Sequence, residues 1–266
     1  MQSVLSRASP ADVTLAPFPH LVIKDALEPG YYRKLMSEFP GIESVNKKNR
    51  KLANNDATFL GAADIIDSTE FSDDWKKLFR YHVSADFLKE AAALIGKPAI
   101  AMHSSLAPFL SILEKKTVGI ADSGEKADFY MQCQFGMNSP VLRESSVRTA
   151  HIDNPKKIYN ALLYCRSPDD DSEGGDLALY RFKGKPGFRD LRTALPNRIE
   201  EVARIPYAAN TLVLFANSIN SVHGVTPRKP TRHVRRYINF QVELEEAIFE
   251  IPYVSRLTSI VESVWG

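Results

Sequence analysis

A short stretch in the middle of the chain places an imidazole and a carboxylate two residues apart, at His151 and Asp153. Residues i and i+2 of a strand point to the same side, so both groups can face one metal ion. A third ligand is available downstream at His223, in the segment Asn220-Ser-Val-His-Gly-Val-Thr-Pro227. Two histidines and one carboxylate leave three coordination positions open, which suits a redox-active divalent metal such as Fe(II). Because H-x-D triplets also arise by chance, this hypothesis needs support from the rest of the chain.

Length and composition indicate a globular chain. The sequence has 266 residues, of which 44% are hydrophobic and 25% are charged, and this suits a single domain with a real core. The 34 basic and 32 acidic residues give a net charge of +2, so bulk charge favours neither nucleic acid nor an acidic membrane as a partner. We therefore expect no nucleic-acid or membrane partner, and the composition leaves the oligomeric state open.

The cysteines and the apolar segments bear on the compartment. Cys133 and Cys165 both fall on expected strands among inward-facing residues, which favours buried thiols over a disulfide. The first 19 residues lack an apolar run of signal-peptide length, and no stretch approaches the roughly eighteen apolar residues of a membrane span. The sequence thus predicts a cytoplasmic protein without membrane contact, which suits reduced iron.

Helices dominate the expected structure before residue 128. Pro29 suits the first turn of a helix, and Ser72 is a good N-cap followed by two acidic residues. The polar segment 43–59 is most simply a mobile loop, with a lid over a pocket as the less favoured alternative. The expected elements are a strand at 18–24, a helix at 29–39, a helix from Ser72 to a stop at 96–98, and a helical or irregular segment at 105–116.

The pattern changes to short strands from Asp128 onward. Runs of alternating or apolar residues are separated by turn residues at regular spacing, which is typical of a sandwich or a barrel. Glycine, serine and proline in the segment 136–140 are expected to end the first of these strands. The expected strands cover 129–135, 159–165, 174–180, 210–216, 221–225 and 235–244, and a closing helix is expected at 252–264.

The order of these motifs is more specific than any one of them. H-x-D, then Glu-Gly-Gly-Asp-Leu-Ala-Leu-Tyr, then Ala-Asn-Thr-Leu-Val-Leu-Phe, then His-Gly-Val-Thr-Pro and an arginine at the head of a strand occur in that sequence. This order resembles the 2-oxoglutarate/Fe(II)-dependent dioxygenases of the prolyl-hydroxylase-like branch. The resemblance covers 128–245 and implies an α+β fold with a mainly β core. That core would be a double-stranded β-helix (jelly roll) at 128–245, flanked by a helix-rich part at 17–125, all within one domain of residues 1–266.

The resemblance also implies cofactors and an activity. His151, Asp153 and His223 match the family's ligands for Fe(II), and the open positions would take 2-oxoglutarate and O2. Members of the family hydroxylate unactivated C–H bonds and release succinate and CO2. Asp153 stands where halogenating members carry Gly or Ala, which disfavours halogenation.

The distal carboxylate of 2-oxoglutarate needs a cationic partner, for which a bidentate guanidinium is well suited. The family spacing after the second histidine admits Arg232, Arg235 and Arg236. Alternation places Arg235 with Tyr237, Asn239 and Gln241 on a polar face, so Arg235 is favoured for the cosubstrate. Arg232 fits the shorter family spacing and is the second candidate. Tyr164, by its position in the family pattern, and Asn239, four residues beyond Arg235, are further candidates for binding 2-oxoglutarate.

Substrate contacts are assigned to Arg148 and Gln134, which would point near the mouth of the barrel. Arg148 would grip a substrate carboxylate, with a surface salt bridge as an equal alternative. The preferred function is hydroxylation of a small molecule, such as an amino acid or a natural-product intermediate. The alternatives are hydroxylation of a protein or peptide residue and a non-catalytic jelly-roll module that binds a metal or ligand. A zinc hydrolase is disfavoured because no carboxylate stands at a suggestive spacing to act as general base.

Overall fold

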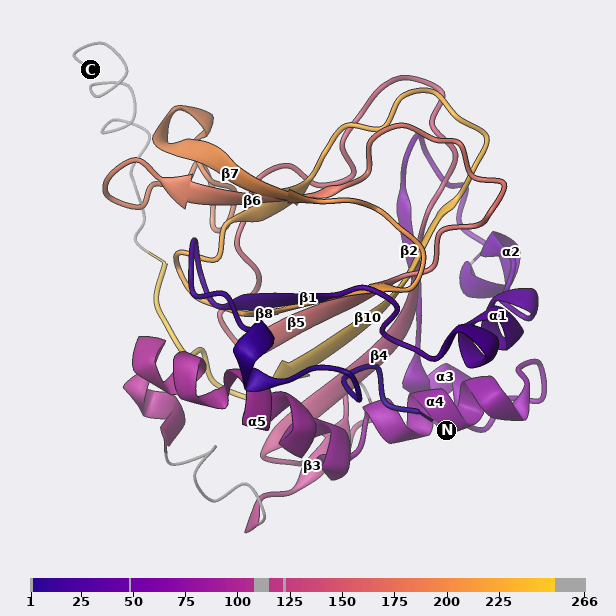
Figure 1. Ribbon diagram of the computed structural model, residues 1–266, viewed down its shortest axis with the longest axis horizontal. Helices are drawn as coiled ribbons and strands as arrows, with labels where there is room; N and C mark the ends of the chain where they lie inside the picture. Colours follow the sequence, from indigo (N-terminus) through magenta and orange to yellow (C-terminus); the bar gives the residue numbers. More distant parts are fainter. Residues whose placement is uncertain (1, 48, 108–114, 122, 252–266) are drawn as a thin grey trace.

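The computed structural model describes residues 2–47, 49–107, 115–121 and 123–251, and it has a sheet-rich α+β architecture (Figure 1). Within these residues every α-helix precedes Ser104. The helices are α1 (Pro29–Ser37), α2 (Ile42–Val45), α3 (Ala62–Ile65), α4 (Asp73–His82) and α5 (Ala85–Met102), with single 3-10 turns at Pro10–Asp12, Ser104–Leu106 and Pro196–Arg198. The strands are β1 (His20–Ile23), β2 (Ala57–Gly61), β3 (Val118–Ile120), β4 (Phe129–Asn138), β5 (Lys157–Tyr164), β6 (Leu177–Phe182), β7 (Ile199–Ile205), β8 (Thr211–Ala216), β9 (His223–Val225) and β10 (Arg235–Glu243).

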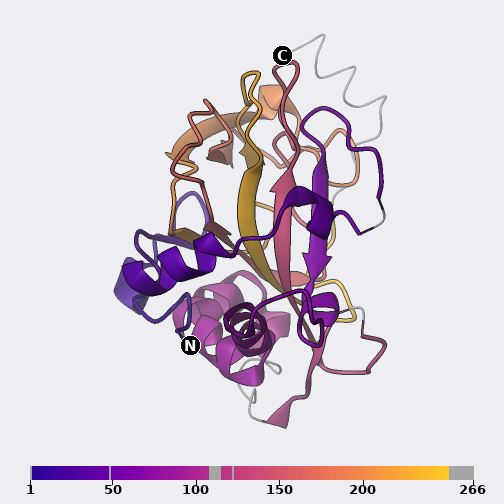
Figure 2. The same cartoon turned by 90° about the vertical axis from the view of Figure 1, so that its right-hand side faces the viewer.

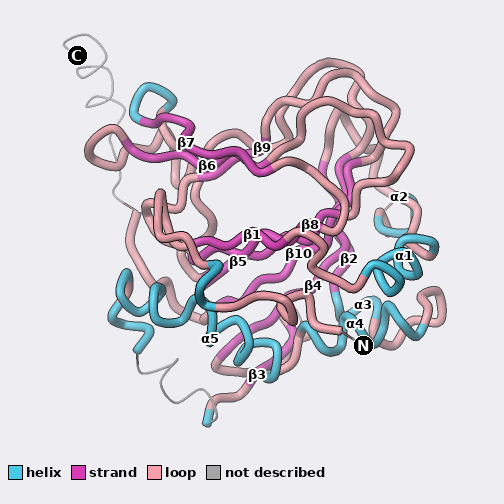
Figure 3. Tube along the Cα trace, in the orientation of Figure 1, coloured by secondary structure: helices cyan, strands magenta, loops and turns pink. Residues whose placement is uncertain are grey.

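The strands form two sheets. The large sheet has the order β1-β8-β5-β10-β4-β2 and is antiparallel, while β3 adds to β4 in parallel. The small sheet has the order β7-β6-β9. Figure 1 shows the small sheet facing one side of the large sheet, and Figure 3 shows long loops joining them at one end. In the view turned by 90°, α4 and α5 lie together beneath the strands (Figure 2).

The register of the central strand β10 sorts polar from apolar side chains. Tyr237 lies opposite Tyr164 of β5 and Gly136 of β4. Two residues further along β10, Asn239 lies opposite Leu162 of β5 and Gln134 of β4, so these pairs share one face of the sheet. Because successive side chains of a strand point to opposite faces, one face of three neighbouring strands is polar and the other is apolar. The polar face contains Gln132, Gln134 and Asn138 of β4, Asn160 of β5, and Arg235, Tyr237, Asn239 and Gln241 of β10.

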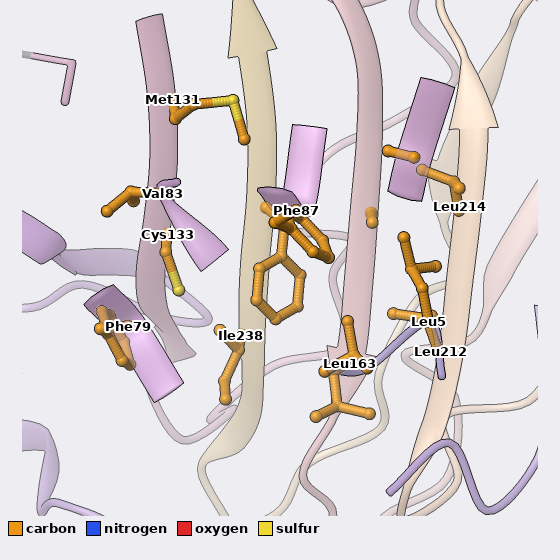
Figure 4. Close-up of a cluster of buried hydrophobic side chains, with 14 of the residues drawn as sticks. Leu5, Phe79, Val83, Phe87, Met131, Cys133, Leu163, Leu212, Leu214 and Ile238 are labelled. Carbon is orange, nitrogen blue, oxygen red and sulfur yellow. The ribbon is translucent and has the colours of Figure 1, made fainter. Parts of the chain in front are cut away.

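The apolar face forms the main core with the helices. Side chains of β4, β5, β8 and β10 meet Phe79 of α4 and Phe87 of α5, and all of these residues are buried (Figure 4). Cys133 belongs to this core, and both cysteines are buried free thiols, as the sequence predicted. This core fixes the strands whose other face carries the polar side chains.

Phe135 is expected to be a major contributor to stability. Its fully buried ring contacts four other aromatic rings, with centroid distances of 4.7 to 5.8 Å: those of Phe39, Phe71, Trp75 and Phe79. Phe135→Ala should therefore lower the free energy of unfolding by about 3–5 kcal/mol, as measured by urea denaturation. Leu15→Ala, at a position that is 67% exposed, should change it by less than about 0.5 kcal/mol. Equal effects of the two substitutions would contradict this assignment of the core.

Strand β4 is longer than the sequence predicted. It runs through Gly136 to Asn138 instead of ending at residue 135. A Cβ atom at Gly136 would come within 2.3 Å of the Tyr237 ring. Gly136 therefore makes room for an aromatic side chain of β10, which is a common reason for glycine within a strand.

The helices of the first half also differ from the prediction. The expected long helix from Ser72 is two helices, α4 and α5, and Ser84 caps the second by accepting a hydrogen bond from the Phe87 backbone N–H. Helix α5 continues past Gly96 and Pro98 to Met102. Burial of one face of this apolar helix against the sheet outweighs the local tendency of glycine and proline to end it.

The segment 43–59 was wrongly expected to be a loop throughout. It includes most of α2 and the start of β2, which pairs with β4 from Ala57 opposite Asn138 to Gly61 opposite Gln134. Strand β7 was not predicted. Its charged residues Glu200, Glu201 and Arg204 interrupt the alternation of polar and apolar residues that is typical of a strand. The predicted helix at 252–264 and most of the segment 105–116 lie outside the described residues. Among the described helices, none is long and apolar enough to cross a membrane.

Candidate active site

His151 and His223 are brought together by direct backbone pairing. The His151 N–H donates to the His223 carbonyl at 2.8 Å, and the His223 N–H donates back to the His151 carbonyl at 2.9 Å. Asp153 follows two residues later, and its carboxylate oxygens lie 3.8 Å from Nε2 of His151 and 3.4 Å from Nε2 of His223. One ligand atom from each residue lies within 4.8 Å of the others, so the three side chains can reach one ion. All three are buried.

The protonation states of His151 and His223 also suit metal binding. Nδ1 of His151 is 2.8 Å from the Thr149 carbonyl, and Nδ1 of His223 is 2.8 Å from the Ser221 carbonyl. Donation from these Nδ1–H groups leaves the Nε2 lone pairs facing Asp153. Burial lowers the pKa of both imidazoles, which favours the neutral form that binds metals.

Asp153 is held as an oriented carboxylate. Burial alone would raise its pKa, but attraction to the nearby charges, those of Lys157 and Arg148 among them, lowers the pKa below its ordinary value. Asn160 donates a hydrogen bond to Oδ2 of Asp153 at 2.6 Å. Asn160 was missed from the sequence, although alternation along β5 from Tyr164 through Leu162 would have placed it on the same face. The donor set is thus two neutral imidazoles and one ionised carboxylate.

The three side chains open into a cavity of about 490 Å³ between the two sheets. The large sheet contributes the polar face of β4, β5 and β10, and the small sheet contributes Leu177, His223 and Val225. Of the residues predicted from sequence, Gln134, Arg148, His151, Asp153, His223, Arg235 and Asn239 line this cavity. The cavity therefore joins the candidate metal site to the candidate cosubstrate residues.

Arg235 lies in a cage of aromatic rings at one end of this cavity. Its guanidinium carbon is 5.1 Å from the ring centroid of Tyr164 and 5.0 Å from those of Tyr207 and Tyr237. Nε donates to the Gly175 carbonyl at 2.9 Å, and Nη1 donates to Oδ1 of Asn138 at 3.3 Å. Arg235 is only 2% exposed, and it has no carboxylate partner among the described residues. The rings shield a cation whose charge the surrounding protein does not neutralise.

Two polar atoms of Arg235 and its aromatic cage lack hydrogen-bond partners among the described residues. They are Nη2 of Arg235 and the hydroxyl of Tyr164. Burial raises the pKa of Tyr164 to about 12, so its hydroxyl stays protonated and is a donor. Buried donors are rarely left unpaired, and two donors next to an unneutralised guanidinium fit a carboxylate ligand. The residues present therefore fit the distal carboxylate of 2-oxoglutarate.

The three candidate arginines lie in different surroundings, and Arg235 lies on the face that alternation along β10 predicted. Arg235 lines the cavity, whereas Arg236 points to the other face, packs over the Phe39 ring and donates to the Cys165 carbonyl. Arg232 is exposed and lines a separate surface hollow. Tyr164 lies behind Arg235 and is not part of the cavity wall.

A second buried arginine was missed from the sequence. Arg228 is fully buried beside Arg235, and its Nη2 donates to the His233 carbonyl at 2.8 Å. Gly175 allows the two arginine side chains to come close, because a Cβ there would be 3.2 Å from both Cδ atoms. The surrounding sequence, Thr226-Pro-Arg-Lys-Pro230, has the composition of an exposed loop and gives no signal for burial.

A model of the 2OG-Fe(II) oxygenase superfamily matches residues 141–240, which include the three candidate ligands and Arg235. Residues 141–240 therefore carry a 2-oxoglutarate/Fe(II) oxygenase domain, and this domain determines the activity of the protein. It is an oxygenase, and its cofactors are Fe(II), 2-oxoglutarate and O2. No curated protein matches the chain in sequence.

One solved structure shares the fold of this oxygenase at low sequence identity, and two others match it with lower scores. A prolyl 4-hydroxylase from Phytophthora capsici is 13% identical, with a TM-score of 0.51 over 92% of this chain and 68% of that chain. A prolyl-4-hydroxylase from Pseudomonas putida is 13% identical, with a TM-score of 0.44 over 85% of this chain and 93% of that chain. The epimerase SnoN, solved with Fe3+, alpha ketoglutarate and nogalamycin RO, is 10% identical, with a TM-score of 0.44 over 84% of this chain and 78% of that chain. At 13% identity, the likeness to the first of these structures concerns the fold alone.

Proposed function

We propose that this oxygenase hydroxylates an unactivated C–H bond of a small molecule and releases succinate and CO2. The observation that carries the proposal is the shared cavity: a buried His-Asp-His set and a buried, unneutralised guanidinium line the same 490 Å³ space. We further infer that the two facing sheets are the two halves of a double-stranded β-helix, with the helices of the first half covering the outside of one half.

His151, Asp153 and His223 would hold the iron. Their Nε2 and carboxylate atoms are preset by the carbonyls of Thr149 and Ser221 and by the Asn160 amide. Bound iron, together with 2-oxoglutarate and O2, supplies the oxidation of the C–H bond. The task of the protein is to orient the three ligands and to leave the remaining coordination positions open toward the cavity.

Arg235 and Tyr164 would bind the distal carboxylate of 2-oxoglutarate, and Asn239 lies on the same strand face toward the cavity. A guanidinium in a buried aromatic cage keeps its charge away from water, which strengthens its attraction for a carboxylate. Because the strands of the large sheet hold Arg235 in place, the cosubstrate would be fixed relative to the metal ligands.

The remaining part of the cavity favours a small polar substrate. Gln134 and Arg148, the substrate-binding candidates, both line it, and the exposed Arg148 lies where the cavity meets solvent. Gln132 and Gln241 add further hydrogen-bonding groups to the wall. A cavity of about 490 Å³ is in the range of small-ligand sites.

Anaerobic titration of the protein with Fe(II) and 2-oxoglutarate tests the proposal. A keto acid chelated to iron is expected to give a weak visible charge-transfer band that saturates at one equivalent of each. Turnover is then tested by succinate release with a panel of small polar molecules and a panel of peptides. A bound metal without the band would contradict the proposed cosubstrate site, and release stimulated by peptides alone would favour a protein or peptide substrate.

A further inference from the structure

Three more cationic side chains line the cavity beyond Arg235. They are Arg148, Lys157 and Arg192, of which the last two are half-buried. Across residues 2–47, 49–107, 115–121 and 123–251, none of the three side chains has a hydrogen-bond or ion-pair partner. Cationic side chains that face a cavity without partners are unusual, since most charged groups near a protein interior are paired.

Lys157 reaches the cavity because of an irregularity in the sheet. Val242 pairs with Tyr159, but the next residue, Glu243, pairs with Lys157, so Ile158 has no partner on β10. Ile158 and Tyr159 both pack in the main core, whereas regular alternation would place Lys157 on the core side with Tyr159. A β-bulge of this kind redirects a side chain, and here it turns an ammonium group toward the candidate metal site.

The two arginines are placed by backbone pairing around His151. The Arg148 carbonyl accepts a hydrogen bond from the Val225 N–H at 2.9 Å, and the Arg192 carbonyl accepts one from the Ile152 N–H at 3.0 Å. The segment containing His151 thus lies between β9 and the loop that carries Arg192. Both guanidinium groups are positioned by the backbone that also positions the metal ligands.

The charges of the three groups act on one another. Burial lowers the pKa of Lys157, the charges of Arg148 and Arg192 lower it further, and Asp153 and Glu243 oppose this effect. Among the residues that the structure describes, the carboxylates that line the cavity are those of Asp153 and Glu243. If Asp153 binds iron, Glu243 is left against three cations, and repulsion among them would be relieved by a bound anion.

We propose that Arg148, Lys157 and Arg192 form an anion-binding subsite, and that the substrate is a small molecule whose carboxylate or phosphate group is held there. This inference rests on the proposed function, because it places the substrate in the same cavity as the iron and 2-oxoglutarate. Two guanidinium groups and one ammonium group offer the donors that carboxylates and phosphates require. The reacting carbon would then lie between this subsite and the His-Asp-His set.

Calorimetric titration of the protein loaded with Fe(II) and 2-oxoglutarate, without O2, tests the subsite. The probes are inorganic phosphate and acetate, with acetamide as the neutral control. We expect both anions to bind and acetamide not to bind. Each of Arg148→Gln, Lys157→Met and Arg192→Gln should weaken anion binding by about tenfold, since each removes a charged hydrogen-bond donor. Tighter binding of phosphate would indicate a phosphate ester, and tighter binding of acetate an organic acid.

Matched variants control for charge and position in the chain. Arg143→Gln, Lys156→Met and Arg189→Gln remove equal charges from exposed residues that do not line this cavity, and they should leave binding unchanged. Equal affinities for the anions and acetamide would overturn the subsite, as would equal anion binding by all variants. The charge-transfer band separates this failure from that of the proposed function. A normal wild-type band with unselective binding overturns only the subsite, and loss of the band in Arg192→Gln would assign the cluster to 2-oxoglutarate instead.

Discussion

His223→Ala is expected to weaken Fe(II) binding by at least about 100-fold and to abolish succinate formation. Removing residues that merely orient a metal ligand typically weakens metal binding by 10- to 100-fold, so removal of a ligand itself should have at least the upper effect. The structure gives a reason for a large effect here. His151 and Asp153 alone leave the ion with two protein ligands in a buried site, and no third histidine lines the cavity among the described residues. Iron retained after dialysis gives the measurement.

Two further variants make this result specific. Asp153→Asn keeps the shape of the side chain but removes the charge, and it should also lose iron while the fold remains intact by circular dichroism. His233→Ala removes an imidazole that is 3.3 Å from Asp171 and lies outside the cavity, so iron binding should be unchanged. Retention of stoichiometric iron by His223→Ala would remove this residue from the metal site.

The positions of the candidate metal ligands and of Arg235 could be predicted because local rules decide the directions of these side chains. His151 and Asp153 are two residues apart in an extended segment, and Arg235 shares the cavity face with Tyr237 and Asn239 through simple alternation along β10. Such rules hold while a strand is regular and its partners preserve the register. The ladder of β10 is regular from Arg235 to Val242 with β4 and from Tyr237 to Val242 with β5.

The proposed substrate-binding end of the cavity could not be predicted, because regular alternation does not decide where its side chains point. Lys157 turns inward only because the register with β10 shifts at Glu243, and a bulge depends on both strands. Arg192 belongs to a loop that is brought to Ile152 by pairing between segments about forty residues apart. Arg228 packs against Gly175, which lies far away in the chain. Each of these contacts depends on a segment far away in the sequence, so the residues next to Lys157, Arg192 and Arg228 do not predict it.

The errors in the first half have a related cause. Gly96 and Pro98 are strong local signals for a helix end, yet α5 passes through both because its apolar face packs on the large sheet. Strand β2 begins at Ala57, in a segment whose composition suggests a loop, because β4 offers a free edge for pairing. Tertiary packing decided each of these elements against local propensity.

Arg235→Gln is expected to weaken 2-oxoglutarate binding by about 30-fold to more than 1000-fold, with iron binding unchanged. Removing one partner of a buried, hydrogen-bonded charge pair costs about 2–5 kcal/mol, and each 1.4 kcal/mol is tenfold in affinity. The aromatic cage makes the upper part of this range the expectation, because Tyr164 and Tyr207 exclude water that would otherwise solvate the carboxylate. Titration of the charge-transfer band with 2-oxoglutarate gives the affinity directly.

Arg232→Gln is the matched control, since it removes the same charge from an exposed residue three positions earlier. Its 2-oxoglutarate affinity should equal that of the unmodified protein, whereas a loss confined to this variant would move the cosubstrate site to the surface hollow beside β10. Arg235→Lys should fall between the two, because an ammonium keeps the charge but lacks the second parallel donor. Arg228 remains in all of these variants. If Arg228 alone could hold the distal carboxylate, Arg235→Gln would bind 2-oxoglutarate normally, and the unpaired Nη2 of Arg235 and Tyr164 hydroxyl would need another ligand.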